Sequence, residues 1–462
     1  MKVTLRTLQK NYHRYANKNL LIQGWIKTNR DQKDFGFINF NDGSTLNSLQ
    51  IVYDRSLSNF DEITKFRVGC ALTVSGVLIL TPNAKQLYEL KASKIILEAD
   101  ADADFPIQPK RHTREFLREQ AYLRMRTNLF NAVFRVRSLL SFAIHTFFQD
   151  NGFIYVHTPI ITASDAEGAG EMFQVTTLPL HKVPKLDQNT VDFSEDFFGK
   201  AANLTVSGQL EAETFALAFS KVYTFGPTFR AENSNTSRHA SEFWMIEPEV
   251  AFADLKDNMD LIEKMLKYVI KYILKHAKDE LNFFDEFVYP GKIKQLENLV
   301  NSKIVRCNYQ EAIKILQNAN RKWENKIEYG SDLASEHEKY LTDEYFKAPV
   351  FVTNWPEEIK AFYMRLNDDN KTVAAVDLLV PGSGELVGGS QREERLDVLL
   401  KRMEKMNIST KGMEWYINLR RYGGVYHSGF GLGFERLIMY VTGIENIRDV
   451  LPFPRTPRNC EF

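Results

Sequence analysis

One stretch of the sequence, residues 229–249, combines phosphate-binding, acidic and aromatic side chains. Arg230 begins a long polar loop that also contains Arg238 and His239, and the fixed guanidinium fork of an arginine suits phosphate. Strand alternation after this loop places an aromatic ring and carboxylates on one face: Phe243, Met245, Glu247 and Glu249. The pattern predicts the floor of a site for a ligand with a flat ring and a cationic or amide group. A solvated hairpin is the alternative.

A second stretch, residues 377–394, places a lone carboxylate in an apolar, glycine-rich strand. This carboxylate is Glu385. A charge in such a strand is costly unless it is paired or bound to a metal, so Glu385 is a candidate site residue. The surrounding glycines allow a ligand to approach the backbone closely. The alternative is a tight turn before an amphipathic helix.

In a third stretch, residues 425–441, an apolar helix stripe follows a glycine-rich strand. Arg436 lies off that stripe, near the N-terminus of the helix. Because an arginine there opposes the helix macrodipole, its position implies an anionic partner. A surface arginine is the alternative.

Several common catalytic signatures are absent from the sequence. It contains no Gly-x-x-x-x-Gly-Lys-Ser/Thr loop, no Gly-x-Ser-x-Gly and no His-Glu-x-x-His. The glycines of residues 382–389 also lack the dinucleotide-binding spacing. The folds that depend on these signatures are therefore disfavoured.

Composition limits the partners and the compartment. The 462 residues include 59 Lys+Arg and 59 Asp+Glu, so a nucleic acid would have to bind a local basic surface. Cys70, Cys307 and Cys460 are too far apart for a metal motif or a disulfide framework, which fits a reducing compartment. Because we find no secretory segment and no apolar run long enough to span a membrane, we expect a cytoplasmic protein without a membrane partner.

Two patterns of elements would position these side chains. Short strands separated by turn residues predict a small closed barrel in the first part of the chain: 20–27, 35–39, 48–53, 71–80, 86–92 and 93–97. An acidic, alanine-rich stretch follows and reads as a linker.

From Thr127 onward the apolar residues recur at helical spacing, and strands appear without βαβ order. The predicted strands are 204–207, 221–229, 242–253, 350–353, 362–366 and 373–380. Helical patterns cover about 255–318, 392–406 and 433–442. A mostly antiparallel sheet packed against helices is therefore expected.

Three stretches, in this order, are similar to the motifs of a known family. Residues 152–161 look like motif 1, with Pro159 as its proline, the Arg230 hairpin looks like motif 2, and residues 429–436 look like motif 3. Over essentially its whole length the chain resembles the class II aminoacyl-tRNA synthetases of the aspartyl/asparaginyl/lysyl subgroup. Within that subgroup it is most similar to the bacterial asparaginyl branch.

The resemblance implies an α+β fold in two domains. An OB-fold anticodon-binding domain would cover residues 1–100, and a linker would cover 101–126. A class II catalytic domain would cover 127–462, with a helical insertion around 284–341 to which we assign no role.

The resemblance also implies ATP-dependent activation of L-asparagine and its transfer to tRNA(Asn). The asparagine carboxylate attacks the α-phosphate, pyrophosphate leaves, and the terminal adenosine of the tRNA then takes the asparaginyl group. Arg230 would hold the α-phosphate, Arg436 would cover adenine and reach the γ-phosphate, and Glu385 would bind Mg²⁺. Further ATP contacts would come from Glu232, Arg238, His239 and a stacking ring, Phe243. Many relatives have a serine where this chain has Gly388.

For the amino acid, the resemblance implies that three residues bind the substrate ammonium: Ser207, Gln209 and Glu167. Arg392 would bind the side-chain carbonyl oxygen, and Glu247 would accept a hydrogen bond from the amide. Aspartyl enzymes have a lysine where this chain has Ala212. A bound aspartate would therefore face a carboxylate without a compensating cation.

In the first domain, the resemblance implies that Phe37 stacks on the middle anticodon base and that Gln50 hydrogen-bonds it. A buried barrel phenylalanine is the alternative for Phe37. Residues 27–33 supply local positive charge for the tRNA, and motif 1 implies a homodimer.

Two rival functions stay open. One is a relaxed synthetase that also charges aspartate, which Ala212 and Glu247 argue against. The other is an inactive paralogue that only binds tRNA or a partner. The presence of Arg230, Glu385 and Arg436 argues against it.

Overall fold

The computed structural model describes residues 1–84, 86–164, 171–187 and 189–462. The chain divides into two compact units, Met1–Phe134 and Arg135–Phe462, and the boundary falls inside a long helix, α4 (Asn128–Asp150). Each unit is described separately.

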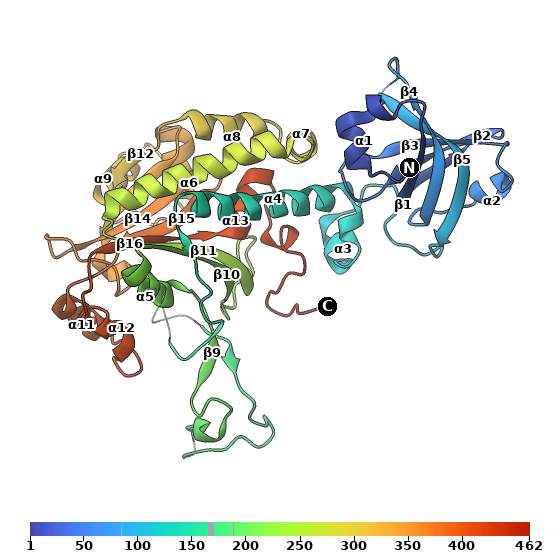
Figure 1. The fold of residues 1–462 in the computed structure, drawn as a ribbon. Coiled ribbons are helices and arrows are strands. Elements are labelled where there is room, and N and C mark those ends of the chain that lie inside the picture. The colour runs from blue at the N-terminus through green and yellow to red at the C-terminus, as the bar shows by residue number, and fades with distance from the viewer. Residues whose placement is uncertain (85, 165–170, 188) are drawn as a thin grey trace. The chain divides into compact units, whose positions relative to one another are not determined.

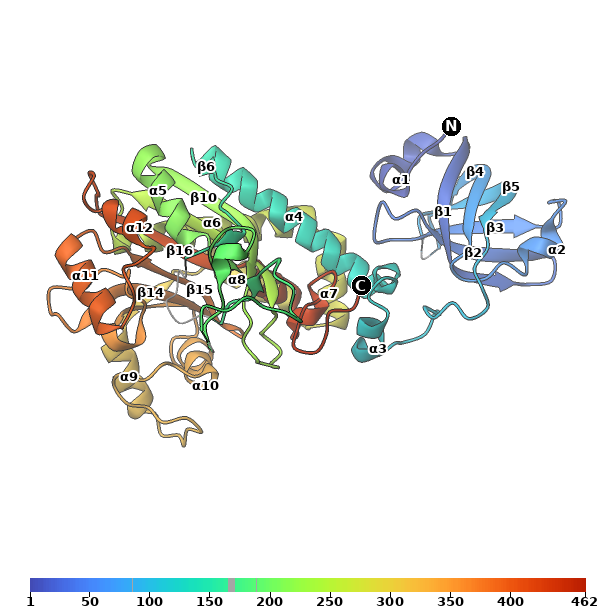
Figure 2. The same ribbon diagram turned by 90° about the horizontal axis from the view of Figure 1, so that it is seen from below.

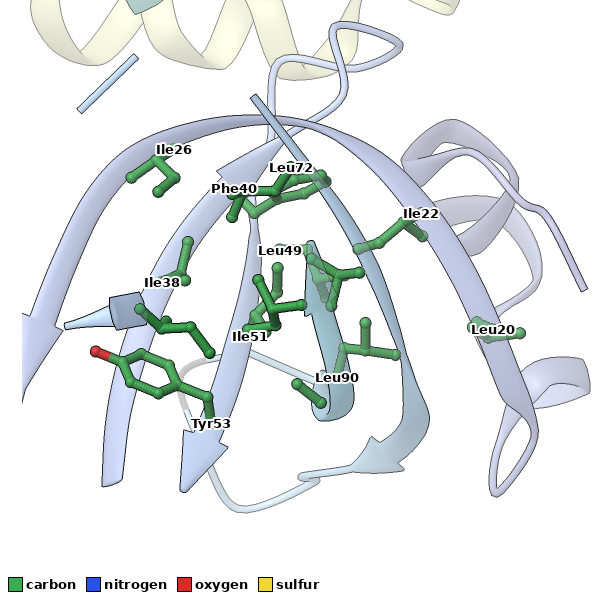
Figure 3. Packing of buried hydrophobic residues seen from close by; sticks show 14 of the residues in the cluster. Leu20, Ile22, Ile26, Ile38, Phe40, Leu49, Ile51, Tyr53, Leu72 and Leu90 are labelled. Atoms are coloured by element: carbon green, nitrogen blue, oxygen red, sulfur yellow. The ribbon is translucent and has the colours of Figure 1, made fainter. Parts of the chain in front are cut away.

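The first unit contains a closed five-stranded barrel with the strand order β1-β2-β3-β5-β4. The strands are β1 (Asn19–Asp31), β2 (Phe35–Asn41), β3 (Leu49–Asp54), β4 (Ala71–Leu80) and β5 (Tyr88–Ala99). Alternate residues face inward because side chains of a strand point to opposite faces. Figure 3 shows the resulting core, with Ile38 and Phe40 of β2 beside Ile51 and Tyr53 of β3.

Short helices complete this unit: α1 (Leu5–Asn11), α2 (Phe60–Ile63) and α3 (Arg114–Glu119). The prediction of separate strands over 86–92 and 93–97 was wrong, because β5 is a single strand. Its register with β4 shifts between Ser75 and Gly76, and this irregularity lets one strand follow the whole curve of the barrel.

The second unit is built on an eight-stranded sheet in the order β12-β13-β14-β15-β16-β11-β10-β6. Its strands in chain order are β6 (Ile154–Tyr155), β10 (Lys221–Phe229), β11 (Glu242–Ala251), β12 (Val305–Asn308), β13 (Val350–Pro356), β14 (Thr372–Val380), β15 (Gly384–Gln391) and β16 (His427–Gly433). The neighbouring strands are antiparallel except at the two ends, where β12 pairs with β13 and β6 pairs with β10 in parallel. A smaller sheet has the order β7-β9-β8 and contains β7 (Ile161–Thr162), β8 (Gln174–Val175) and β9 (Ala202–Leu204).

Helices α6 and α5 contact the large sheet from opposite sides (Figure 1). Helix α8 packs on α6, and α11 and α12 share a hydrophobic cluster with α5. The helices that follow α4 are α5 (Gln209–Phe219), α6 (Leu255–His276), α7 (Lys278–Phe287), α8 (Lys292–Asn301), α9 (Tyr309–Gln317), α10 (Ser335–Lys339), α11 (Leu396–Lys405), α12 (Glu414–Asn418) and α13 (Phe434–Thr442). Figure 2 shows α5, α11 and α12 from below. Helix α6 begins with a capping box, in which Asp254 and Asp257 each bond the other's backbone N–H. Its apolar stripe is buried against the sheet.

The α+β class, with a barrel followed by an antiparallel sheet and helices, is confirmed. Two element predictions for this unit were wrong. The helical pattern over 255–318 is interrupted by β12, a four-residue strand too short to show its own period. Residues 362–366 form only isolated bridges, with Met364 opposite Arg392. Within the described part of the chain, no helix combines the length and apolarity needed to cross a membrane.

Candidate active site

A cleft of about 320 Å³ lies in the second unit and brings the three predicted stretches together. Its lining includes the predicted ATP and asparagine residues that the structure describes: Ser207, Gln209, Arg230, Glu232, Arg238, His239, Phe243, Glu247, Glu385, Arg392 and Arg436. The prediction for Glu167 lies outside the described residues.

Strand β11 forms the floor of this cleft. As alternation predicts, Phe243, Met245, Glu247 and Glu249 all line it. The neighbouring strand β16 makes room for them, because a Cβ on Gly429 would lie only 2.1 Å from Oε1 of Glu249. The glycines of the third stretch therefore accommodate side chains from the next strand.

Cationic side chains gather at one end of the cleft. Arg230 follows directly after β10, and its guanidinium carbon lies 5.5 Å from the centre of the Phe243 ring. Arg238 donates to the carbonyl of Ser383. Arg436 lies at the start of α13, and its Nη1 donates to Oε2 of Glu385 at 3.2 Å. Three arginines and an aromatic ring in one cleft suit a nucleoside triphosphate.

Carboxylates converge beside this cationic end. A Cβ on Gly388 would lie 3.2 Å from Oε1 of Glu385 and 3.4 Å from Oδ1 of Asp377. Asp377 also accepts from Nζ of Lys360 at 2.7 Å, and burial raises the pKa of this aspartate. Glu338, from α10, accepts from the backbone N–H of Glu385 at 3.2 Å. Burial, followed by the charge of Glu385, raises the pKa of Glu338 to about 7.

Two carboxylates were not predicted from the sequence: Asp377, which lines the cleft, and Glu338, which contacts Glu385. The sequence could have indicated Asp377, because it is a lone carboxylate in an apolar strand, as Glu385 is. No local pattern indicates Glu338, because it comes from a separate helix that is 47 residues away in sequence from Glu385.

The other end of the cleft holds buried, hydrogen-bonded polar groups. Glu247 accepts from Oγ of Ser207, from the backbone N–H of Gly208 at 3.0 Å, and from Oγ1 of Thr224 at 3.2 Å. Gln209 is the first residue of α5, and its Nε2 donates to Oε1 of Glu213 at 3.2 Å. These contacts fix the orientation of the side chains predicted for the amino acid.

Arg392 is buried at the same end and is already paired. Its Nε and Nη2 donate to the two oxygens of Glu249, and its Nη1 donates to Oγ of Ser390 at 2.7 Å. Burial alone would lower the pKa of Arg392, but the charge and hydrogen bonds of Glu249, together with the charge of Glu213, outweigh burial and raise it. The helix predicted over 392–406 begins only at Leu396, because Arg392 ends the strand region and bridges Met364.

Ala212 does not line the cleft. It is fully buried in an apolar cluster with Val156, Ala216 and Val222. The next residue, Glu213, instead contacts Gln209 of the cleft, and it was not selected from the sequence. Its spacing of four from Gln209 was the available signal, since residues four apart share a helix face.

In the barrel, Phe37 and Gln50 lie on the neighbouring strands β2 and β3, which pair Phe37 with Val52 and Asn39 with Gln50. They are therefore diagonal neighbours on one face, opposite to the face of Ile38. Phe37 is half-buried, lies outside the core and packs edge-on against Phe35. The alternative of a buried core phenylalanine is not observed.

Comparison with known proteins identifies the family. The model for class II tRNA synthetases (D, K and N) matches residues 113–457, and the model for an OB-fold nucleic acid binding domain matches residues 20–98. The chain is 62% identical to the asparagine–tRNA ligase of Acholeplasma laidlawii, and both chains are covered completely. It belongs to the asparagine–tRNA ligases. This confirms the family predicted from the three motifs.

Solved structures of asparaginyl-tRNA synthetases agree. The enzyme of Pyrococcus horikoshii in complex with asparaginyl-adenylate superposes with a TM-score of 0.88 at 32% identity, covering 100% of both chains. The Entamoeba histolytica enzyme in complex with asparaginyl-adenylate has a TM-score of 0.82 at 25% identity, covering 96% of this chain and 97% of that one. The asparagine–tRNA ligase fold thus extends over both units.

Proposed function

We propose that this cleft converts L-asparagine and ATP into asparaginyl-adenylate and pyrophosphate, and that the asparaginyl group then passes to the terminal adenosine of tRNA(Asn). One observation carries the proposal: a single cleft joins an arginine-rich end to a buried polar end. The first suits the phosphates of ATP, and the second suits a small polar amino acid.

The reaction needs no general base on the protein, because the substrate carboxylate is already a nucleophile. Catalysis then consists of positioning and of neutralising the charge that develops on the phosphates. We assign these roles to Arg230 at the α-phosphate and to Arg436 at the γ-phosphate. The adenine would stack on Phe243, and the remaining ATP contacts would come from Glu232, Arg238 and His239.

The carboxylates beside Gly388 fit a magnesium ion, which prefers oxygen ligands. Glu385 and Asp377 would hold it, and Mg²⁺ would neutralise charge on the phosphates when bound. Since Gly388 has no side-chain oxygen, water would supply the remaining ligands.

At the polar end, Ser207, Gln209 and Glu167 would bind the substrate ammonium. Arg392 would donate to the side-chain carbonyl oxygen of asparagine, and Glu247 would accept from its amide. Because Glu249 already balances the charge of Arg392, the pocket offers donors without an unpaired cation. A neutral amide fits this arrangement better than a carboxylate.

For the tRNA, we propose that the exposed face of β2 and β3 binds the anticodon, with Phe37 stacking and Gln50 hydrogen-bonding. A homodimer through motif 1 is also part of the proposal. It is supported by exposed apolar side chains in this stretch: Ile154, Tyr155, Ile160 and Ile161. The cytoplasmic location stays part of the same proposal.

The test is amino-acid-dependent ATP–pyrophosphate exchange with asparagine and with aspartate. Exchange with asparagine alone supports the proposal, and equal exchange with aspartate would indicate a relaxed synthetase. No exchange with either, from folded protein that binds tRNA, would indicate the inactive paralogue.

A matched pair of variants locates the reaction. Arg230→Ala should lower exchange about a hundredfold or more, because it removes charge stabilisation at the α-phosphate. Arg306→Ala, which changes an arginine of β12 outside the cleft lining, should leave exchange unchanged.

A further inference from the structure

A buried polar cluster adjoins the amino-acid end of the cleft. We call it the Glu213 cluster, and it consists of Glu213, Tyr416, Arg420 and His427. The Glu213 side chain has no exposed surface, and the other three members are also buried. None of the four lines the cleft. The cluster joins α5, α12 and β16.

Glu213 accepts hydrogen bonds from every other member of the cluster. Its Oε2 accepts from Nη2 of Arg420 at 2.9 Å and from Nε2 of His427 at 2.8 Å. The Tyr416 hydroxyl lies 3.0 Å from both carboxylate oxygens. So many donors hold the carboxylate in its ionised form, and the pKa of Glu213 is correspondingly lowered even though burial opposes this.

His427 contacts oxygen atoms through both of its ring nitrogens. Its second ring nitrogen, Nδ1, lies 2.8 Å from the carbonyl oxygen of Val425. Glu213 thus lies between the His427 ring and the Arg420 guanidinium, and Arg420 supplies a buried cation beside it.

The cluster reaches the substrate end of the cleft through one hydrogen bond and lies close to a second cleft residue. Gln209, which lines the cleft, donates to Oε1 of Glu213 at 3.2 Å. In addition, ligand-type atoms of Glu213, Glu249 and His427 all lie within 4.8 Å of one another. The arginines Arg392 and Arg420 already occupy the oxygens of these carboxylates, so the group is a charge network and not a metal site.

The charge of Glu213 also acts on Arg392. Burial lowers the pKa of that guanidinium, but Glu249 and then Glu213 outweigh burial and raise it. Glu249 and Glu213 therefore both balance the positive charge of Arg392, the residue proposed to face the substrate side chain.

We propose that Glu213 is a positioning and specificity-determining residue of the amino-acid pocket. Its carboxylate orients Gln209 toward the substrate. Its buried negative charge also balances Arg392, so that the pocket accepts the neutral amide of asparagine and disfavours the second carboxylate of aspartate. This inference rests on the proposed function. Ala212 lies in an apolar cluster, so the selectivity between asparagine and aspartate is assigned to the charge of Glu213 instead.

The first test is Glu213→Gln, which keeps the shape of the side chain and removes its charge. ATP–pyrophosphate exchange should show a KM for asparagine raised about tenfold, because Gln209 loses an ionised acceptor. The KM for ATP and kcat should change little. The ratio of kcat/KM for asparagine to that for aspartate should fall about tenfold.

Two further variants separate charge from structure. Tyr416→Phe removes one donor and keeps the charge, so the asparagine-to-aspartate ratio should stay within about twofold. Arg420→Gln removes a cation beside Glu213, so this ratio should rise. Opposite shifts in Glu213→Gln and Arg420→Gln are not expected from general damage to the fold, and Arg420→Gln tests the idea even if Glu213→Gln does not fold.

The control is Glu263→Gln, which changes a partly buried carboxylate of α6 that pairs with Lys267 outside the cleft lining. All its kinetic constants should match wild type. An unchanged ratio in folded Glu213→Gln, or a parallel rise in the KM values for ATP and asparagine, would overturn the assignment to Glu213. Failure of the wild-type enzyme itself to exchange with asparagine would instead refute the proposed function.

Discussion

At the scale of single residues, the cleft depends on where side chains are missing as much as on where they are present. Gly429 leaves space for Glu249, and Gly388 leaves space between two carboxylates. Because Gly388 does not have a positive φ, its substitution tests this space and not backbone strain.

The first prediction concerns Gly388→Ala. The added methyl group would lie 3.2 Å from Oε1 of Glu385 and 3.4 Å from Oδ1 of Asp377. By displacing these proposed magnesium ligands, it should raise the Mg²⁺ concentration for half-maximal ATP–pyrophosphate exchange about fivefold. The control is Gly226→Ala on β10, where the new Cβ would meet no atom within 4 Å. An unchanged magnesium requirement in Gly388→Ala would argue against the proposed ligands.

The site was predictable to the extent that its residues lie in three short stretches with distinctive spacing. Arg230, Glu385 and Arg436 were found that way, and the structure brings them into one cleft. The partners of these residues were not predictable. The pairing of Arg392 with Glu249 joins positions 143 residues apart, and no local pattern encodes that contact.

At the scale of elements, local sequence signals succeeded where an element has its own period. The barrel strand β4 was predicted with its observed limits, as was β10 in the large sheet. The local signals failed where pairing with another strand decides whether a segment becomes a strand. Strand β12 pairs in parallel with β13 over four residues. Residues 362–366 pair only at single positions, Met364 with Arg392 and Leu366 with Val373, so they form no strand.

Helix α8 contains an unusual first residue. Lys292 is 3% exposed, and its Nζ donates to Oε1 of Gln295 at 2.6 Å and to the carbonyl of Tyr440 at 3.0 Å. No carboxylate is among these two acceptors, and burial lowers the pKa of this lysine from 10.5 to about 8.

The second prediction follows from that shift. Below about pH 8 the lysine is charged in both states, so the folded state bears the full cost of burying the charge. Between pH 8 and 10.5 the folded state loses its proton first, so stability rises with pH. Relative to Lys292→Met, which does not titrate, the wild-type free energy of unfolding should gain about 3 kcal/mol across this range.

Urea unfolding at a series of pH values measures this difference. Lys294→Met, at an exposed position of the same helix, is the matched control, and its difference from wild type should stay flat. A flat profile for Lys292→Met as well would show that Lys292 titrates alike in the folded and unfolded states.

At the scale of the whole molecule, one edge of the large sheet bears on assembly. Strand β6 is the last strand of the large sheet, and Ile154 in it is 44% exposed. An exposed apolar strand at a sheet edge calls for a partner. Motif 1 includes this strand, in agreement with the proposed homodimer.

The third prediction is therefore that Ile154→Glu converts a dimer to a monomer in sedimentation analysis. The introduced charge would be desolvated in the interface but hydrated in the monomer, so folding should persist. Phe287→Glu, on α7, is the control, since it adds the same charge at an apolar residue that is 66% exposed. A monomeric wild type, or a dimeric Ile154→Glu variant, would count against motif 1 as the interface.

The order of strands in the large sheet also has a consequence for synthesis on the ribosome. Its middle is closed by β16, which places Gly433 beside Met245, although 188 residues separate the two in the chain. The barrel strands, in contrast, all lie between Asn19 and Ala99. The nascent barrel can thus fold early in translation, whereas β11 can pair with β10 but lacks its other neighbour until β16 emerges. During that interval one edge of β11 is unpaired and open to wrong pairing.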